Sequence, residues 1–294
     1  MNDGGQVAEA GSYADRYFTT KDGVKLHYRD YSGSEGKPPL LCLHGLTRNS
    51  RDFADFADRY SPAWRVLALD FRGRGMSDYD PVPARYTPLT YADDLIQLLD
   101  DLMIGRAVFI GTSLGGLVTM TMAAIAPQYI AAAILNDVGP DVEASGVDRI
   151  LTYVGKDRRF GNWDEAADAI ASNYGSAFEN YSHDDFVAMA KRNCREENGE
   201  IRFDYDMAIA EPFRTSGPVP RVDLWPLFTA LGQKPLLVVR GESSDLLTAA
   251  TLEKMHTAVP SMKSVTVPGI GHAPMLDEPE AIVAIDQFLS ELDV

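Results

Sequence analysis

The fold of this chain is decided by the stretch Ala107-Val108-Phe109-Ile110-Gly111-Thr112-Ser113-Leu114-Gly115-Gly116. Its first four residues form an apolar run, which is typical of a strand buried on both faces. That run leads into the pattern G-x-S-x-G, after which apolar residues recur at helical spacing at Leu117, Met120, Ala124 and Ile125. The stretch therefore predicts a strand, a tight turn and a helix in direct succession.

Ser113 lies at the centre of the predicted turn. A strand-to-helix turn this tight strains the backbone of its central residue and lifts that side chain clear of the sheet. Gly111 and Gly115 are required because a Cβ atom at either position would collide with the neighbouring strand or helix. We therefore predict that Ser113 is a nucleophile, which requires a base and an acid elsewhere in the chain.

Length, composition and charge limit the possible partners. The chain has 294 residues, 45% of them hydrophobic, which is enough for one large domain or for one domain with an insertion. The formal net charge of −16 disfavours nucleic acids and anionic membrane surfaces, because both would repel it. The longest apolar stretch, residues 115–135, is interrupted by Pro127 and is not typical of a membrane span. We expect a small-molecule substrate as the partner, and the sequence predicts no oligomeric state.

The N-terminal residues 1–14 are predicted to be a disordered tail. This stretch is rich in glycine and acidic residues, and it lacks the basic and apolar regions of a secretory signal. Only two cysteines occur, Cys42 and Cys194, so no disulfide framework is expected. These features together predict a cytoplasmic location.

A second motif, His44-Gly45-Leu46, follows an apolar run at Leu40–Leu43 that predicts another buried strand. The tetrahedral intermediate of a serine hydrolase needs two N–H donors, one after the nucleophile and one in the loop after the third strand. Leu114 and Leu46 are predicted to supply this oxyanion hole. His44 precedes the serine and lies in a loop-forming His-Gly pair, so we expect it to support the loop rather than act as the base.

The third motif is the loop Asp70-Phe71-Arg72-Gly73-Arg74-Gly75-Met76-Ser77. Its arginines and glycines raise the alternative of phosphate binding. We do not favour that alternative, because no helix begins at once and no Lys-Ser or Lys-Thr pair follows. In their order along the chain, the three motifs resemble the α/β-hydrolase superfamily, and the likeness runs from about Arg16 onward.

The resemblance implies a mostly parallel central sheet flanked by helices, the order nucleophile, acid, histidine, and no cofactor; we also assign no metal site. It further implies a helical cap inserted over the active site. We place this cap at residues 141–225 and the core at residues 15–140 and 226–294. Haloalkane dehalogenases and epoxide hydrolases are similar in layout but carry an aspartate where Ser113 stands, which argues against both. Most aromatic residues of the cap are expected to form its own core, with a few facing the substrate.

The acid and the base are sought in loops at strand ends. A late apolar strand ends in Gly241-Glu242-Ser243-Ser244-Asp245, and we predict Asp245 as the acid that accepts the imidazole N–H. The alternative is Asp137, which also follows a strand and resembles the acid position of some members of the superfamily. Asp245 is favoured because Asp137 opens into the cap. His272 is predicted as the base because, of the five histidines, it alone lies downstream of the acid in a strand-end loop.

The predicted function is that of a serine hydrolase that cleaves a carboxylic ester or lactone of a small to medium, partly apolar substrate through an acyl-enzyme. The first alternative is a C–C bond hydrolase of ring-cleavage products. Family members of that kind often carry a tryptophan directly after the histidine of the triad, where this chain has Ala273. A cofactor-free perhydrolase and a triad-bearing small-molecule receptor are further alternatives.

Overall fold

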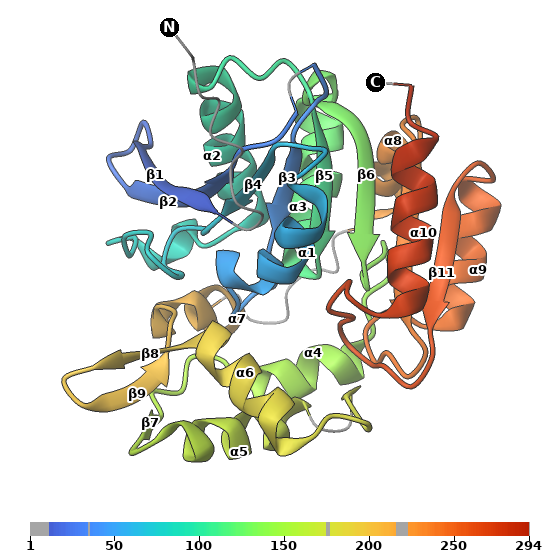
Figure 1. Ribbon diagram of the computed structural model, residues 1–294. Coiled ribbons are helices and arrows are strands. Elements are labelled where there is room, and N and C mark those ends of the chain that lie inside the picture. The colour runs from blue at the N-terminus through green and yellow to red at the C-terminus, as the bar shows by residue number, and fades with distance from the viewer. Residues whose placement is uncertain (1–11, 35, 175–176, 216–222, 294) are drawn as a thin grey trace, which may run out of the picture.

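A computed structural model describes residues 12–34, 36–174, 177–215 and 223–293. Its centre is an eight-stranded sheet with the strand order β1-β2-β4-β3-β5-β6-β10-β11 (Figure 1). The strands are β1 (Tyr13–Thr19), β2 (Lys25–Tyr31), β3 (Leu40–Leu43), β4 (Val66–Leu69), β5 (Ala107–Thr112), β6 (Ile130–Asn136), β10 (Leu236–Gly241) and β11 (Lys263–Val267).

The sheet is mostly parallel, as predicted. The hairpin of β1 and β2 is antiparallel, and β2 also runs antiparallel to β4. From β4 to β11 every pair of neighbours is parallel. All residues of β3, β4 and β10 are buried, because helices cover both faces and the strands are apolar runs without alternation.

Two sets of helices cover the sheet. The helices are α1 (Ala54–Tyr60), α2 (Pro88–Asp101), α3 (Leu114–Ile125), α8 (Trp225–Leu231), α9 (Ala249–Ala258) and α10 (Pro279–Ser290). Helices α2, α3 and α8 pack side by side, whereas α10 packs against β10 and β11. Helix α10 also meets α1, because the Tyr60 hydroxyl donates to Asp286 Oδ1 at 2.8 Å. In Figure 1, α1 and α10 lie in front of the sheet and α2 and α8 behind it.

The segment between β6 and α8 lies at one end of the sheet (Figure 1). It contains helices, as expected, namely α4 (Ala144–Leu151), α5 (Trp163–Tyr174), α6 (His183–Asn193) and α7 (Glu211–Thr215). It also contains a three-stranded antiparallel sheet that the sequence analysis did not predict, formed by β7 (Arg159–Phe160), β9 (Glu200–Phe203) and β8 (Cys194–Glu197). Short 3₁₀ helices lie at Ser50–Phe53, Pro83–Arg85, Pro127–Tyr129 and Met207–Ala210.

The hairpin of β8 and β9 follows directly after α6. Asn198 and Gly199 adopt φ values of 55° and 80°, which make the tight turn. Cys194 pairs with Phe203 across the hairpin, and both are buried. Arg202 pairs with Glu197 at 2.9 Å. The hairpin therefore buries a pair of residues at its open end, and its turn lies at Asn198 and Gly199.

The N-terminal expectation is partly wrong. Residues 1–11 of the expected tail lie outside the described residues. Tyr13 and Ala14, however, belong to β1 and pair with Tyr31 and Asp30. Among the helices that the structure describes, none combines the length and the apolar character needed to cross a bilayer.

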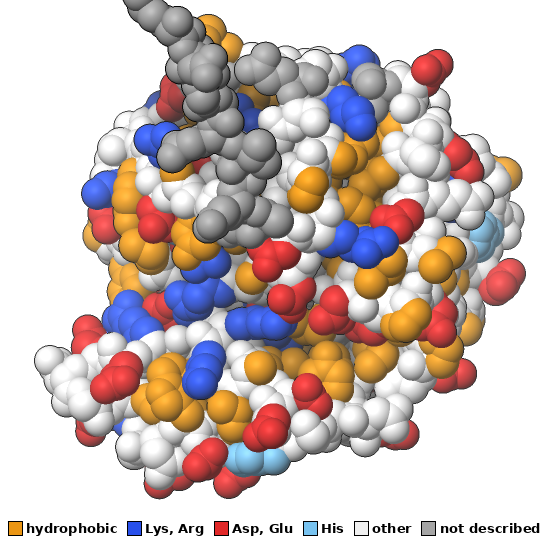
Figure 2. Space-filling view, in the orientation of Figure 1, with side chains coloured by type: hydrophobic (Ala, Val, Ile, Leu, Met, Phe, Trp, Pro, Cys, Tyr) orange, Lys and Arg blue, Asp and Glu red, His pale blue; other side chains and the backbone are white. Residues whose placement is uncertain are grey.

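Ion pairs join the segment between β6 and α8, called the cap segment below, to the rest of the chain, called the core. Arg51 Nη2 donates to Asp204 at 2.7 Å, and Arg192 of α6 pairs with Asp55 of α1 at 2.5 Å. Figure 2 shows Lys and Arg side chains gathered where the two parts of the molecule meet. The cap segment is therefore held over the end of the sheet by ion pairs to which both parts contribute a charge.

Candidate active site

Ser113 lies at the turn between β5 and α3, with φ 51° and ψ −111°. A Cβ atom on Gly111 would lie 2.6 Å from the carbonyl carbon of Gly115. A Cβ atom on Gly115 would lie 2.1 Å from the carbonyl oxygen of Leu43. Both positions therefore accept only glycine, and the steric reason predicted for the G-x-S-x-G spacing is confirmed.

His272 lies beside Ser113. Its Nε2 atom is 3.0 Å from Ser113 Oγ, and its Nδ1 atom is 2.7 Å from Asp137 Oδ2. Because a carboxylate only accepts, Nδ1 carries the proton, and Nε2 is left to accept from the Ser113 hydroxyl. The three side chains thus form one chain of hydrogen bonds in which the imidazole is able to take the serine proton.

The acid in contact with His272 is Asp137, and the prediction of Asp245 is wrong for this contact. Asp245 instead accepts from Arg149 of α4, at 2.5 Å from Nε and 2.9 Å from Nη2. Asp137 directly follows β6, the strand next to the serine strand, and its φ of 55° turns the chain there. Asp137 was disfavoured because the chain opens into the cap after it. That position does not prevent its side chain from reaching His272.

The Asp137 carboxylate is buried and accepts three hydrogen bonds. The Gly241 N–H donates to Oδ1 at 2.8 Å, and the Ser244 hydroxyl donates to Oδ2 at 2.5 Å, alongside His272 Nδ1. Ser244 is the residue before the predicted acid, so the loop after β10 supplies a donor to the site rather than the carboxylate. These donors hold the carboxylate in one orientation, which in turn fixes the imidazole.

The loop after β3 lies against the serine. A Cβ atom on Gly45 would lie 3.8 Å from Ser113 Cβ, and Leu46 lines the same pocket as Ser113. Leu114 is the first residue of α3 and directly follows Ser113. Leu46 and Leu114 are therefore near the serine, and their role as oxyanion donors stays a prediction.

His44 supports this loop, as predicted. The Phe71 N–H donates to His44 Nε2 at 3.0 Å, so Nδ1 carries the proton and donates to the Gly45 carbonyl at 2.7 Å. The ring is fully buried, and burial lowers the pKa of His44 to about 4. The imidazole is therefore neutral, and it connects the loop at Gly45 to the loop at Phe71 by hydrogen bonds.

A pH dependence of stability follows from His44. In the unfolded chain its pKa is near 6.5, so below that pH the unfolded state gains a proton that the folded state does not. We expect the free energy of unfolding to fall by about 2 kcal/mol on this account between about pH 7.5 and pH 5.2. Urea unfolding of the wild type and His44→Gln measures it, because the glutamine amide retains a donor and an acceptor but does not titrate. Equal pH slopes for the two proteins would contradict the assignment.

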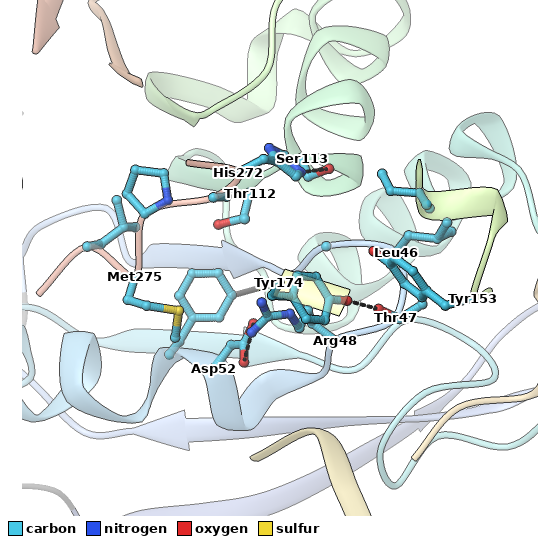
Figure 3. Close-up of a pocket in the computed structure, with 16 residues that line it drawn as sticks. Leu46, Thr47, Arg48, Asp52, Thr112, Ser113, Tyr153, Tyr174, His272 and Met275 are labelled. Carbon is cyan, nitrogen blue, oxygen red and sulfur yellow. Dashed lines mark hydrogen bonds and ion pairs between the residues drawn. The ribbon is translucent and has the colours of Figure 1, made fainter. Parts of the chain in front are cut away.

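The pocket around Ser113 has a cavity volume of about 50 Å³, so only a small part of a ligand is enclosed there. Figure 3 shows side chains from the core and the cap segment lining it together. Its apolar lining includes Leu46, Phe53, Ile150, Met275 and Leu276. Within the described residues, no group of three or more His, Cys, Asp or Glu side chains could hold a metal ion.

The pocket also holds polar residues that the sequence analysis did not single out. The Tyr174 hydroxyl lies 3.3 Å from Thr47 Oγ1, and the ring centroids of Tyr153 and Tyr174 are 5.4 Å apart. Arg48 and Asp52 lie beside them (Figure 3). The Thr47-Arg48 pair follows the His44-Gly45-Leu46 motif directly, and this position, in the loop that lies against Ser113, is the signal that could have identified it.

Comparison with known proteins supports the fold. The model of the alpha/beta hydrolase family matches residues 40–285. The chain belongs to the alpha/beta hydrolase family. A crystal structure of an alpha/beta hydrolase from Novosphingobium aromaticivorans has 51% sequence identity and a TM-score of 0.90, covering 96% of this chain and 99% of that chain.

Two curated relatives of this α/β-hydrolase match over most of their length. A 3-hydroxybutyrate-oligomer hydrolase from Cupriavidus necator is 32% identical over 273 residues, which cover 90% of this chain and 93% of the relative. A 2-(acetamidomethylene)succinate hydrolase from Mesorhizobium japonicum is 30% identical over 253 residues, covering 86% of this chain and 88% of the relative. The relatives are hydrolases that differ in the substrate their names give.

Proposed function

We propose that this α/β-hydrolase cleaves a carboxylic ester or lactone through an acyl-enzyme on Ser113. The observation that carries the proposal is the chain of hydrogen bonds from Ser113 Oγ through His272 to Asp137. A serine at a strained turn, hydrogen-bonded to an imidazole that a carboxylate orients, has the geometry of an activated nucleophile.

In the proposed mechanism, Ser113 Oγ attacks the carbonyl carbon while His272 Nε2 takes the serine proton. Negative charge then develops on the carbonyl oxygen, which accepts hydrogen bonds from the N–H groups of Leu46 and Leu114. His272 passes its proton to the leaving oxygen, and the acyl group stays on Ser113. Water repeats the sequence on the acyl-enzyme and releases the acid. Asp137 stabilises the imidazolium at both stages.

The name of the Cupriavidus necator relative favours an ester substrate, because hydroxybutyrate units in an oligomer are joined by ester bonds. The mixed apolar and polar lining of the pocket fits a small hydroxy-acid ester. The second relative is named for a succinate derivative instead. For that reason, cleavage of a bond other than an ester is the competing outcome of the test below.

Pre-steady-state kinetics test the proposal. On mixing with a p-nitrophenyl ester we expect a burst of nitrophenol, followed by steady turnover of about 1 to 10³ per second on a good substrate. Mass spectrometry of the intact protein during turnover should show one acyl group on Ser113.

The panel should also include lactones, a vinylogous diketone and a peracid assay. Preference for the diketone with poor ester turnover would favour the C–C bond hydrolase. Tight binding without steady turnover would favour the receptor. If no ester or lactone exceeded a rate of about 0.01 per second, far below the usual range, ester hydrolysis would be ruled out.

A further inference from the structure

The pocket holds a buried arginine that the proposed chemistry does not use. Arg48 is 8% exposed and lies two residues after Leu46, on the loop that faces Ser113. Figure 3 shows it between Asp52 and Tyr174, across the pocket from Ser113 and His272. Burying a guanidinium in a largely apolar pocket costs free energy unless the group has strong hydrogen-bond partners. The partners of Arg48 therefore indicate what it binds.

Arg48 has weak partners within the protein. Its Nη1 atom lies 3.3 Å and 3.4 Å from the two carboxylate oxygens of Asp52. Both distances are longer than the roughly 2.7–2.9 Å of a strong hydrogen bond between a charged nitrogen and a carboxylate. Its guanidinium carbon lies 5.1 Å from the centroid of the Tyr174 ring. Among the described residues, Nε and Nη2 have no hydrogen-bond acceptor.

The pair of Nε and Nη2 is the edge of a guanidinium that binds a carboxylate with two parallel hydrogen bonds. Other arginines of this chain use that same edge in this way. Arg65 binds Asp30 at 2.9 Å and 2.8 Å, and Arg72 and Arg149 bind Asp94 and Asp245 through the same two atoms. Arg48 differs from them because its carboxylate partner, Asp52, contacts the remaining nitrogen.

Arg48 is also close to the nucleophile. Its Cγ atom lies 3.5 Å from the point where a Cβ on Gly45 would stand, and Ser113 Cβ lies 3.8 Å from that same point. The two carbons are therefore no farther apart than these two distances together. The guanidinium is only a few bonds beyond Cγ. A short substrate with one carboxylate and one ester can therefore span the distance from Ser113 to the guanidinium.

We propose that Arg48 forms a carboxylate-binding subsite, so that the substrate is an ester that also carries a free carboxylate. The inference rests on the proposed ester hydrolysis for its substrate class. The carboxylate takes the Nε and Nη2 edge of Arg48, and Asp52 stays on Nη1 and keeps the guanidinium oriented. A carboxylate fits better than a phosphate, because the nearby Asp52 repels a second negative charge more strongly.

Two matched pairs of substrates test the subsite. Monoethyl glutarate and ethyl glutaramate differ only in a carboxylate against a carboxamide on the acyl side of the ester. The pair 3-acetoxybutyrate and 3-acetoxybutyramide makes the same change on the alcohol side. We expect wild-type kcat/KM to favour the carboxylate of at least one pair by about tenfold or more, and the pair that shows it identifies the side that Arg48 reads.

Arg48→Met should lower kcat/KM for that carboxylate on the order of 10²-fold, while its carboxamide changes by less than about threefold. Asp52→Asn should raise kcat/KM for the carboxylate, because the negative charge that repels the substrate is removed while the amide oxygen still accepts from Nη1. Arg106→Met is the matched control: it removes the same charge from an exposed position and should change neither member. If Arg48→Met does not fold, the double variant Arg48→Met/Asp52→Asn is used in its place, because it removes both charges of the pair together.

A binding measurement separates this inference from ester hydrolysis itself. Calorimetry of glutarate with the wild type and Arg48→Met needs no turnover, and binding should be lost in the variant. Glutarate binding that depends on Arg48, without turnover of any ester, would overturn the proposed function but support the subsite. Ester turnover with equal rates within both pairs, or an equal loss for both members in Arg48→Met, would overturn the subsite alone.

Discussion

Ser113→Ala is expected to lower kcat for a good ester by about 10⁶-fold. The hydroxyl is the only group in the proposed mechanism that forms a covalent bond with the substrate, and His272 Nε2 lies 3.0 Å from it. His272→Ala should cause a loss of similar size, because the serine then lacks its base. The double variant should be little worse than either single one, since the two residues act as a unit. Single-turnover kinetics with one ester on all three variants measure these losses.

Unchanged circular dichroism and unfolding midpoints are the controls, because neither side chain is part of the apolar core. A residual rate of about 10³-fold over the uncatalysed reaction should persist in each variant, through binding and the oxyanion donors. Losses that multiply in the double variant would mean that Ser113 and His272 act independently. In that case, the hydrogen bond between them would not be the catalytic contact.

The parts of the site that the sequence predicted are those fixed by local sterics. The turn at Ser113 needs glycine at two positions whatever the rest of the chain does, and the strands beside it are unbroken apolar runs. The parallel sheet follows, because strands separated by helices must return in the same direction. His272 could be selected by its place at a strand end.

The acid could not be selected in the same way. Asp137 and Asp245 both follow a buried strand, and the difference between them is the direction in which each loop turns. The backbone at Asp137 has φ 55°, and the loop after β10 presents Ser244 inward and Asp245 toward Arg149. Neither turn is encoded by periodicity. Arg149 lies 96 residues from Asp245, so the contact that removes Asp245 from the site is tertiary.

Arg48 was missed for a related reason. A single arginine in a loop is usually a solvated residue, and nothing in the local pattern distinguishes it. Its burial depends on Tyr174, which belongs to α5 of the cap segment, and on Asp52 one helical turn later. The cap segment itself was predicted from a change of pattern, but its three-stranded sheet was not, because each of those strands has four residues or fewer.

Asp137→Asn is expected to lower kcat by about 10⁴-fold. The Gly241 N–H donates to Oδ1, so the asparagine oxygen takes that position and its NH₂ group faces His272. His272 Nδ1 must then accept, which places the ring proton on Nε2 and leaves no acceptor for the Ser113 hydroxyl. Asp245→Asn should reduce kcat by less than about tenfold, because it loosens only the contact with Arg149. Steady-state kinetics of both variants on one ester compare the two carboxylates directly. The reverse order of losses would mean that the loop after β10 rearranges during the reaction to bring Asp245 onto His272.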